Sequence, residues 1–229
     1  MKIIRFEEIS STNEYAKTLV KDKLSLIVTA KKQSGGKGTK GRSFSSEVGG
    51  VYLTKLSFYD DFPAKNACLI MSGAAVAVCK TLEFYGLKPQ IKWANDVFVE
   101  GKKICGILIE NGFSGANISY SIVGIGLNVR NEFPVELQRI AISMKEATGR
   151  DFSVEEVTKT LIAYLQEEPS AEEYQKRLGF LRTPVWLVEG EKTTKVQAVG
   201  VTDGLELIVE EENGIRRLVR AGEVSLKVE

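Results

Sequence analysis

The pattern of apolar and polar positions divides the first third of the chain into three strands and a buried helix. Residues 2–8 alternate between polar and apolar side chains, which is typical of an edge strand. A β-branched run at 25–31 predicts a buried strand, and another strand is predicted at 51–58. Residues 64–85 are small and apolar on almost every side of a helical wheel. This segment is therefore predicted to be a helix buried in the core.

Three further strands are predicted in the middle of the chain, at 91–99, 103–111 and 119–129. The tight turn Glu100-Gly101-Lys102 joins the first two, which favours an antiparallel hairpin. Capping boxes, in which a serine is followed three residues later by a glutamate, predict helices that begin after Ser11, after Ser153 (153–167) and after Ser170 (170 to about 178). The pattern predicts an α+β fold, with a mixed or antiparallel sheet flanked by helices.

The pattern changes from Thr183 onward. Five short apolar strands follow one another, separated by turn residues such as Asp203-Gly204 and Asn213-Gly214. Several short strands in so few residues predict a small SH3-like β-barrel. We therefore expect two domains, at 1–181 and 182–229.

Composition excludes several functions. The 229 residues include 31 basic and 30 acidic side chains, for a net charge of +1, so the chain has no overall field that would attract nucleic acid or an anionic membrane. There is no histidine, which excludes Ser-His-Asp and Cys-His catalysis within this chain. Cys68, Cys79 and Cys105 show no CxxC spacing and are expected to be buried, reduced thiols. With neither a signal peptide nor a membrane span expected, we predict a cytoplasmic protein.

A basic, glycine-rich loop occupies residues 33–50. Its segment 36–41 fits the G-x-G-x-x-G pattern, but another strand follows it instead of the helix that a dinucleotide fold requires. A protein kinase would also need an HRD histidine, which is absent. Glycines and interleaved cations suit phosphate binding, and a solvated surface loop is the alternative.

Six ordered motifs make the chain resemble the biotin protein ligases. They are SSTN at 10–13, GKGTKGRSF after Gln33, IKWAND at 91–96, KKICGILIE at 102–110, VGIGLNV at 123–129 and AGEVSL at 221–226. The resemblance implies a class II synthetase-like ligase domain at 1–181 and an SH3-like domain at 182–229. It also implies a cytoplasmic enzyme that forms biotinyl-5′-AMP from biotin and ATP with Mg²⁺. The biotin is then transferred to a lysine of a biotin carboxyl carrier protein domain.

The same resemblance suggests roles for individual residues. Expected at the biotin site are Ser11, Thr12, Asn13, Gln33, Gly36, Lys37, Gly38, Thr39 and Lys103. Expected at the ATP site are Arg42, Lys92, Asn95 and Asn128. Asp96 is expected to bind the metal, while Lys103, Lys37 and Arg42 are the expected catalytic residues.

Several of these residues have simpler structural explanations. Ser11 and Thr12 also suit plain helix capping, and Asn95-Asp96 also suits a turn at a strand end. Strand alternation places Lys103 on the face that carries Cys105 and Ile107, where a lysine is unusual without an anionic partner. It could instead extend from the strand end into solvent.

The chain departs from the family at Lys37 and Thr39, where arginine is usual. Thr39 has no charge, so we expect looser retention of the adenylate. Alternatives are a lipoate or octanoate ligase, a non-catalytic protein that binds biotin or nucleotide, and an RNA-binding protein. No strand precedes residue 2, so we expect the short form without an N-terminal DNA-binding domain and without nucleic-acid or membrane partners. A homodimer is one possible assembly.

Overall fold

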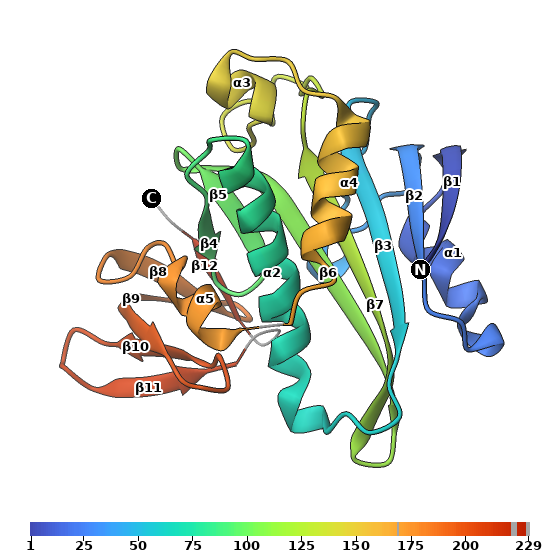
Figure 1. The fold of residues 1–229 in the computed structure, drawn as a ribbon. Coiled ribbons are helices and arrows are strands. Elements are labelled where there is room, and N and C mark those ends of the chain that lie inside the picture. Colours follow the sequence, from blue (N-terminus) through green and yellow to red (C-terminus); the bar gives the residue numbers. More distant parts are fainter. Residues whose placement is uncertain (169, 221–223, 228–229) are drawn as a thin grey trace.

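The computed structural model describes residues 1–168, 170–220 and 224–227, which form two β-sheets and their surrounding helices (Figure 1). The larger sheet contains β1 (Lys2–Ile9), β2 (Leu26–Gln33), β3 (Gly50–Phe58), β4 (Gln90–Lys92), β5 (Asp96–Val99), β6 (Lys102–Ser114) and β7 (Asn117–Asn128). The smaller sheet contains β8 (Pro184–Glu189), β9 (Lys192–Val201), β10 (Leu207–Glu210), β11 (Arg216–Val219) and β12 (Val224–Lys227). The α-helices are α1 (Thr12–Thr18), α2 (Ala67–Phe84), α3 (Met144–Thr148), α4 (Val154–Tyr164) and α5 (Ala171–Lys176).

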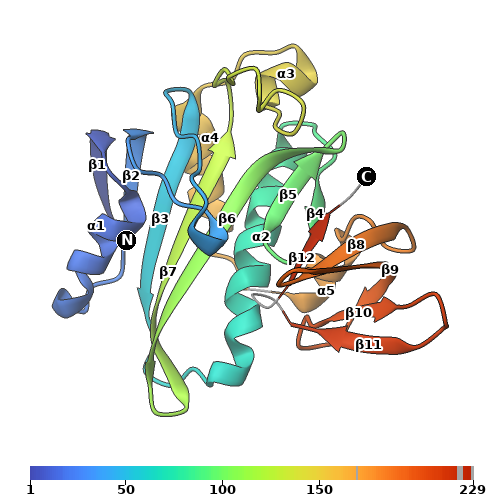
Figure 2. The ribbon, with the colours of Figure 1, turned by 180° about the vertical axis from the view of Figure 1, so that it is seen from behind.

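The larger sheet is mixed, with the strand order β1-β2-β3-β7-β6-β5-β4. Strand β1 pairs in parallel with β2, and the other neighbouring strands pair antiparallel. Helices α2 and α4 cover one face (Figure 1), whereas α1 and the loop after β2 lie on the opposite face, which Figure 2 shows from the front. The predicted α+β class with a mixed sheet is confirmed.

Helix α2 forms the centre of the core. Its residues Ala75, Val78 and Leu82 have no exposed surface and pack against the sheet. The span Ala64–Phe84 is long and apolar enough to cross a bilayer by length and composition, with a mean hydropathy of 1.6. In the structure 56% of an apolar 18-residue stretch within this span is buried inside the protein, as expected for a core helix.

Three helix starts agree with the capping-box prediction. The hydroxyls of Ser11, Ser153 and Ser170 each accept a hydrogen bond from the backbone N–H three residues later, at distances of 3.4, 3.3 and 3.2 Å. Each serine thereby satisfies a donor that the first helical turn leaves unpaired.

The single strand predicted at 91–99 is wrong. The structure divides this segment into the short strands β4 and β5, which pair antiparallel with Lys92 opposite Asp96. The residues between them, 93–95, form the connecting turn. An Asn-Asp pair is favourable in such a turn because its side chains can bond to nearby backbone groups.

The predicted face of Lys103 is also wrong. Val97 pairs with Cys105, but the next residue, Phe98, pairs with Lys103, so β6 contains one extra residue at this point. Such a β-bulge reverses the alternation of side chains beyond it. Lys103 therefore lies on the same face as Gly106, away from the buried Cys105.

The smaller sheet has the order β11-β10-β9-β8-β12, and all of its pairs are antiparallel. Arg217 pairs with Glu189 on β8, and Arg216 pairs with Glu210 on β10. The motif at 221–226 begins in residues 221–223, which lie outside the described residues.

Candidate active site

A cavity of about 640 Å³ opens on the face of the larger sheet that carries α1. Figure 2 shows the ribbon from the side of this face. It lies between the start of α1, the loop after β2, strands β6 and β7, and the segment that follows β7. Every predicted site residue except Gly36 lines it: Ser11, Thr12, Asn13, Gln33, Lys37, Gly38, Thr39, Arg42, Lys92, Asn95, Asp96, Lys103 and Asn128. The six motifs are distant in the sequence, and the fold brings five of them to one place.

One end of the cavity is neutral and densely hydrogen-bonded. The Thr12 hydroxyl and backbone N–H both donate to the side-chain amide oxygen of Gln33, at 3.0 and 2.8 Å. The buried Thr54 hydroxyl donates to the side-chain amide oxygen of Asn13 at 2.6 Å, and the Asn13 amide nitrogen donates to the Glu110 carboxylate at 3.2 Å. These bonds hold the Thr12 and Asn13 side chains in defined orientations at the cavity wall. Ser11 caps α1 and also lines the cavity, so both of its predicted roles remain compatible with its position.

The glycine-rich loop folds back on itself as a small hairpin. The Phe44 N–H donates to the Gly36 carbonyl at 2.9 Å, and the Gly38 N–H donates to the Arg42 carbonyl at 2.7 Å. A Cβ atom at Gly36 would lie 2.4 Å from the Ser46 Oγ, so only glycine fits there without a shift. Gly36 is buried within the hairpin, and its position therefore indicates a structural role in the loop.

The predicted cations of this loop contact protein atoms near the cavity mouth. The Lys37 ammonium lies 2.8 Å from the Glu14 carboxylate of α1. Glu14 also pairs with Lys17, and these two lysines lower its pKa through their hydrogen bonds. In a capping box the glutamate bonds back to the start of the helix. Here the Glu14 carboxylate instead forms ion pairs with Lys17 and Lys37. Arg42 folds onto Thr39, donating to its hydroxyl at 2.9 Å.

The other end of the cavity is strongly cationic. The Lys103 ammonium lies 2.7 Å from the Asp96 carboxylate, and both side chains are largely shielded from solvent. Burial lowers the pKa of Lys92; Asp96 raises it in part, whereas Lys103 and Arg42 lower it further. Within the described part of the chain, the lining contains one carboxylate and five cations: Lys37, Arg42, Lys92, Lys103 and Arg139. Such an excess of positive charge suits a ligand that carries several negative charges.

The half-buried Asn95 and the buried Asn128 complete the cavity floor with their side-chain amides. The Asn95 amide donates to the Ile107 carbonyl at 2.7 Å, which fixes the turn before Asp96. The Asn128 amide donates to the Ile142 carbonyl at 3.2 Å and accepts from the Asn131 amide at 3.1 Å. Each asparagine keeps its side chain at the end of a strand, next to the cationic part of the cavity.

The Phe44 ring was not predicted as a cavity wall. A Cβ atom at Gly126 would lie 2.5 Å from this ring, and one at Gly106 would lie 3.1 Å from it. The Lys103 ammonium lies 5.9 Å from the ring centroid. The Phe44 ring therefore occupies the space above Gly126 that the absence of a side chain leaves open.

Sequence reasoning also missed the segment after β7. Its side chains Phe133, Leu137, Arg139 and Ile140 line the cavity. The Lys103 N–H donates to the Ile140 carbonyl at 2.9 Å, so the segment returns directly beside the cationic end. The segment combines one proline, charges and apolar residues without any period, and its place next to Lys103 depends on tertiary pairing.

Asp96 is the residue that is predicted to bind the metal, and its surroundings can be compared with known metal sites. Among the described residues, no group of three or more His, Cys, Asp or Glu side chains could hold a metal by itself. Mg²⁺ commonly binds through one or two carboxylates together with substrate phosphates. Asp96 in a cationic cavity fits that arrangement, in which phosphate oxygens supply most of the ligands.

The chain is similar in sequence and in structure to proteins of one family. The profile of the biotin/lipoate A/B protein ligase family matches residues 6–128, more than half of the chain. The bifunctional ligase/repressor BirA of Bacillus subtilis is 29% identical over 96% of this chain and 72% of its own length. The BirA of Escherichia coli is 26% identical over the same shares. A biotin protein ligase from Aquifex aeolicus, solved with biotin and ATP, superposes with a TM-score of 0.79 at 26% identity, covering 100% of this chain and 99% of that one. The chain belongs to the biotin/lipoate A/B protein ligase family.

Proposed function

We propose that this protein is an ATP-dependent biotin protein ligase. It forms biotinyl-5′-AMP and then transfers the biotinyl group to a lysine of a biotin carboxyl carrier protein domain. The observation that carries the proposal is the division of one cavity into a neutral, hydrogen-bonding end and a cationic end, with Lys103 at the cationic end. Relatives named as biotin ligases, and a similar structure solved with biotin and ATP, support the choice of substrates.

The neutral end suits the biotin head group. Hydroxyl and amide groups of Ser11, Thr12 and Asn13 offer both donors and acceptors, which a ureido ring requires. Gln33 holds Thr12 in place, and Lys37, Gly38 and Thr39 bring the loop over the bound molecule. Gly36 contributes through the hairpin that shapes this loop.

In the first step, an oxygen of the biotin carboxylate attacks the α-phosphorus of ATP. A new O–P bond forms, the bond to the β-phosphate oxygen breaks, and pyrophosphate leaves with the electron pair. Two anions must approach each other, so a fixed cation at the point of attack lowers the barrier. We assign this role to the Lys103 ammonium. Arg42 and Lys92 bind the remaining phosphates, while Asn95 and Asn128 bind the adenosine side.

Asp96 would hold Mg²⁺ jointly with the phosphate oxygens, and the metal would supply charge neutralisation for the departing pyrophosphate. Lys103 and Asp96 then remain beside the mixed anhydride. In the second step the neutral amine of the acceptor lysine attacks the biotinyl carbonyl. An amide bond forms, AMP leaves, and the amine releases a proton. The reaction thus consumes one ATP for each C–N bond.

Several features outside the cavity belong to the same proposal. We assign residues 1–181 to the ligase domain and 182–229 to an SH3-like C-terminal domain, a division supported by the separate pairing of the two sheets. We propose a cytoplasmic enzyme whose partner is the carrier domain, with no nucleic-acid or membrane partner. A homodimer is the assembly to test by analytical ultracentrifugation.

The full reaction provides the test. Purified protein, Mg·ATP and a carrier domain are incubated with biotin, lipoate or octanoate in separate reactions, and the carrier is analysed by intact mass. The proposal expects a single biotinyl addition on one lysine. A lipoyl or octanoyl addition instead would assign the chain to the lipoate branch of the family.

A further inference from the structure

Three residues of the turn between β4 and β5 are each held by a different part of the protein. The Trp93 indole N–H donates to the Leu205 carbonyl at 2.8 Å, and Leu205 belongs to the turn between β9 and β10 of the smaller sheet. The Tyr174 hydroxyl of α5 donates to the Ala94 carbonyl at 2.8 Å. The Asn95 carbonyl accepts from the Ile107 N–H at 3.0 Å. The turn thus lies between the two sheets and is bonded to both.

This turn carries side chains of the cationic end of the cavity. Lys92 precedes it and Asp96 follows it, facing each other across the β4–β5 pair. The two strands contain only three and four residues, so their own ladder gives little support. Asp96 also pairs with Gly106 of β6, and the external hydrogen bonds fix the turn that joins Lys92 to Asp96, the ion-pair partner of Lys103.

Both external donors are deeply buried and remain available. Trp93 is 7% exposed and Tyr174 is 1% exposed. Burial raises the pKa of the Tyr174 hydroxyl, so this group stays protonated and keeps donating. A buried hydrogen bond of this kind is expensive to remove, since its acceptor would be left without a partner.

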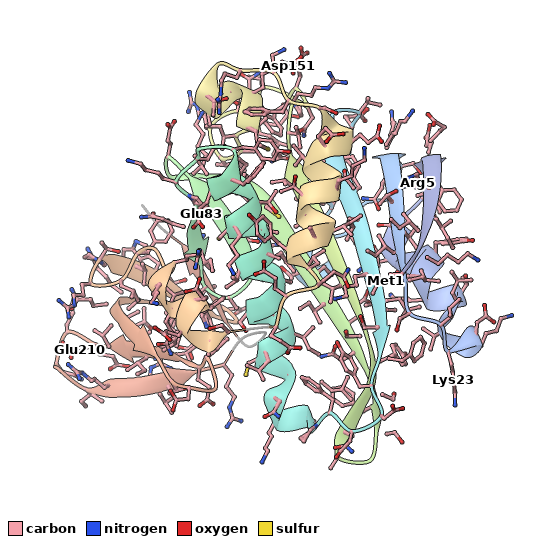
Figure 3. All side chains as sticks on the ribbon, in the orientation of Figure 1. Met1, Arg5, Lys23, Glu83, Asp151 and Glu210 are labelled. Atoms are coloured by element: carbon pink, nitrogen blue, oxygen red, sulfur yellow. The ribbon has the colours of Figure 1, made fainter. Side chains whose placement is uncertain are left out.

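The other groups in these bonds are themselves fixed. The Leu205 N–H donates to the Thr202 carbonyl at 2.9 Å, which holds the turn that presents the Leu205 carbonyl. At the end of α5, the Arg177 guanidinium makes a bidentate pair with the Glu83 carboxylate, at 2.7 and 2.8 Å. Glu83 belongs to α2 and is labelled in Figure 3. Helix α5 is thereby tied to the core helix. The Trp93–Ala94 turn is bound to two anchored elements.

The neutral end of the cavity has separate supports. Thr12 and Asn13 are held by Gln33, Thr54 and Glu110, all from the first seven strands and their loops. None of these hydrogen bonds comes from the smaller sheet or α5. A change in the Trp93 contact should therefore affect one end of the cavity and spare the other.

We propose that Trp93 and Tyr174 are positioning residues for the nucleotide, through which the smaller sheet and α5 set the geometry of Lys92, Asp96 and Lys103. The inference rests on the proposed function, and it adds a specific effect. Loss of either donor weakens the use of Mg·ATP and leaves biotin binding intact.

The test uses Trp93→Phe, which removes the N–H and keeps an aromatic ring, and Tyr174→Phe, which removes only the hydroxyl. KM values for ATP and biotin are measured in the adenylate-forming reaction, and the Kd for biotin alone is measured by calorimetry. We expect the KM for ATP to rise about five- to tenfold, the size of one net hydrogen bond. The Kd for biotin should stay within about twofold, since one bond at the far end contributes little to it.

Two matched variants serve as controls. Trp186→Phe makes the same chemical change within the smaller sheet, and Tyr85→Phe removes a hydroxyl that lies 3.1 Å from the Thr160 hydroxyl on the far side of α2. Both should keep the wild-type KM for ATP. If Trp93→Phe does not fold, Tyr174→Phe decides the question.

A folded Trp93→Phe or Tyr174→Phe variant with an unchanged KM for ATP would overturn the inference, as would an equal loss of ATP and biotin affinity. Failure of the proposed function looks different, because the wild-type protein would then form no biotinyl-AMP. In that case Mg·ATP is titrated directly into wild-type and Trp93→Phe protein. Equal Kd values for the nucleotide would contradict the positioning role independently of the reaction.

Discussion

Replacing Lys103 by glutamine would remove the ammonium that lies 2.7 Å from Asp96 in the cavity. Two effects add. The attack of the carboxylate on the α-phosphate loses its nearest cation, and the Asp96 carboxylate is left facing the triphosphate without a partner. Glutamine is one atom shorter but keeps an N–H donor at the end of the side chain, so the main change is the loss of the charge.

The expected magnitude follows from the position of this charge. Removing one preorganised donor aimed at developing negative charge costs about 10²–10³ in rate, or roughly 3–4 kcal/mol. The Lys103 side chain is 31% exposed, so solvent screens it in part. We therefore expect about a hundredfold slower adenylate formation, toward the lower end of that range.

A single-turnover assay measures this directly. Enzyme in excess over ATP is mixed with biotin, and biotinyl-AMP is quantified over time by mass spectrometry. The control is Lys102→Gln, since Lys102 is the neighbouring lysine and pairs with Glu146 at 3.4 Å. The reasoning would be refuted if Lys103→Gln retained at least a third of the wild-type rate, or if Lys102→Gln lost as much.

Four further outcomes are expected. Thr39→Arg should slow the dissociation of biotinyl-AMP about tenfold or more, because a charge-assisted hydrogen bond contributes about 1.5–3 kcal/mol; the off-rate is measured by a chase with unlabelled biotin. Gly126→Ala should reduce adenylate formation more than about tenfold, because a Cβ atom there would lie 2.5 Å from the Phe44 ring and displace it. Burial raises the pKa of the Cys79 thiol to about 12, so at pH 8 a thiol reagent should modify the half-buried Cys68 first and reach Cys79 only after unfolding. The same raised pKa contributes stability that is present below pH 9 and is lost as the pH rises toward 12, which denaturant titration at pH 8 and 11 checks.

The first three of these have clear contrary results. An unchanged off-rate in Thr39→Arg would show that the missing family arginine does not control retention. Gly200→Ala is the control for the glycine variant, since a Cβ atom there meets nothing within 4 Å, and equal losses in both variants would contradict the role of Phe44. Rapid modification of Cys79 in the native protein would contradict its burial.

The larger elements were predictable because their signals are local. Alternation identified β1, and the β-branched run identified β2. The capping serines located three helix starts, because the bond from serine to the N–H three residues later depends only on nearby sequence. The all-round apolar composition of α2 also predicted its burial.

The failures arose where pairing between distant strands decides the geometry. The apolar run at 91–99 resembles one strand, but Lys92 pairs with Asp96 across a turn. The extra residue in β6 reversed the predicted face of Lys103, and no local pattern marks a bulge. The same limit applies to the cavity wall, because Phe44 reaches Gly126 only through the folded loop.

The site itself was recognisable mainly through the order of its motifs. SSTN, the glycine-rich loop, KWAND and the Lys103 strand meet at one cavity, although each motif alone has an ordinary structural explanation. Gly36 is the exception, since its place inside the hairpin reflects packing. The lining from the segment after β7 had no comparable signal, because its position depends on the backbone bonds of Lys103 to Ile140 and Ile142.

The most direct test of the account is the product that the cavity forms from its two substrates. Purified protein is incubated with Mg·ATP and with biotin, lipoate or octanoate separately, and acyl-adenylates are identified by mass spectrometry. We predict that biotinyl-AMP forms and that the other two acids give no adenylate. The absence of any adenylate, or the formation of lipoyl- or octanoyl-AMP in place of biotinyl-AMP, would contradict the proposed function.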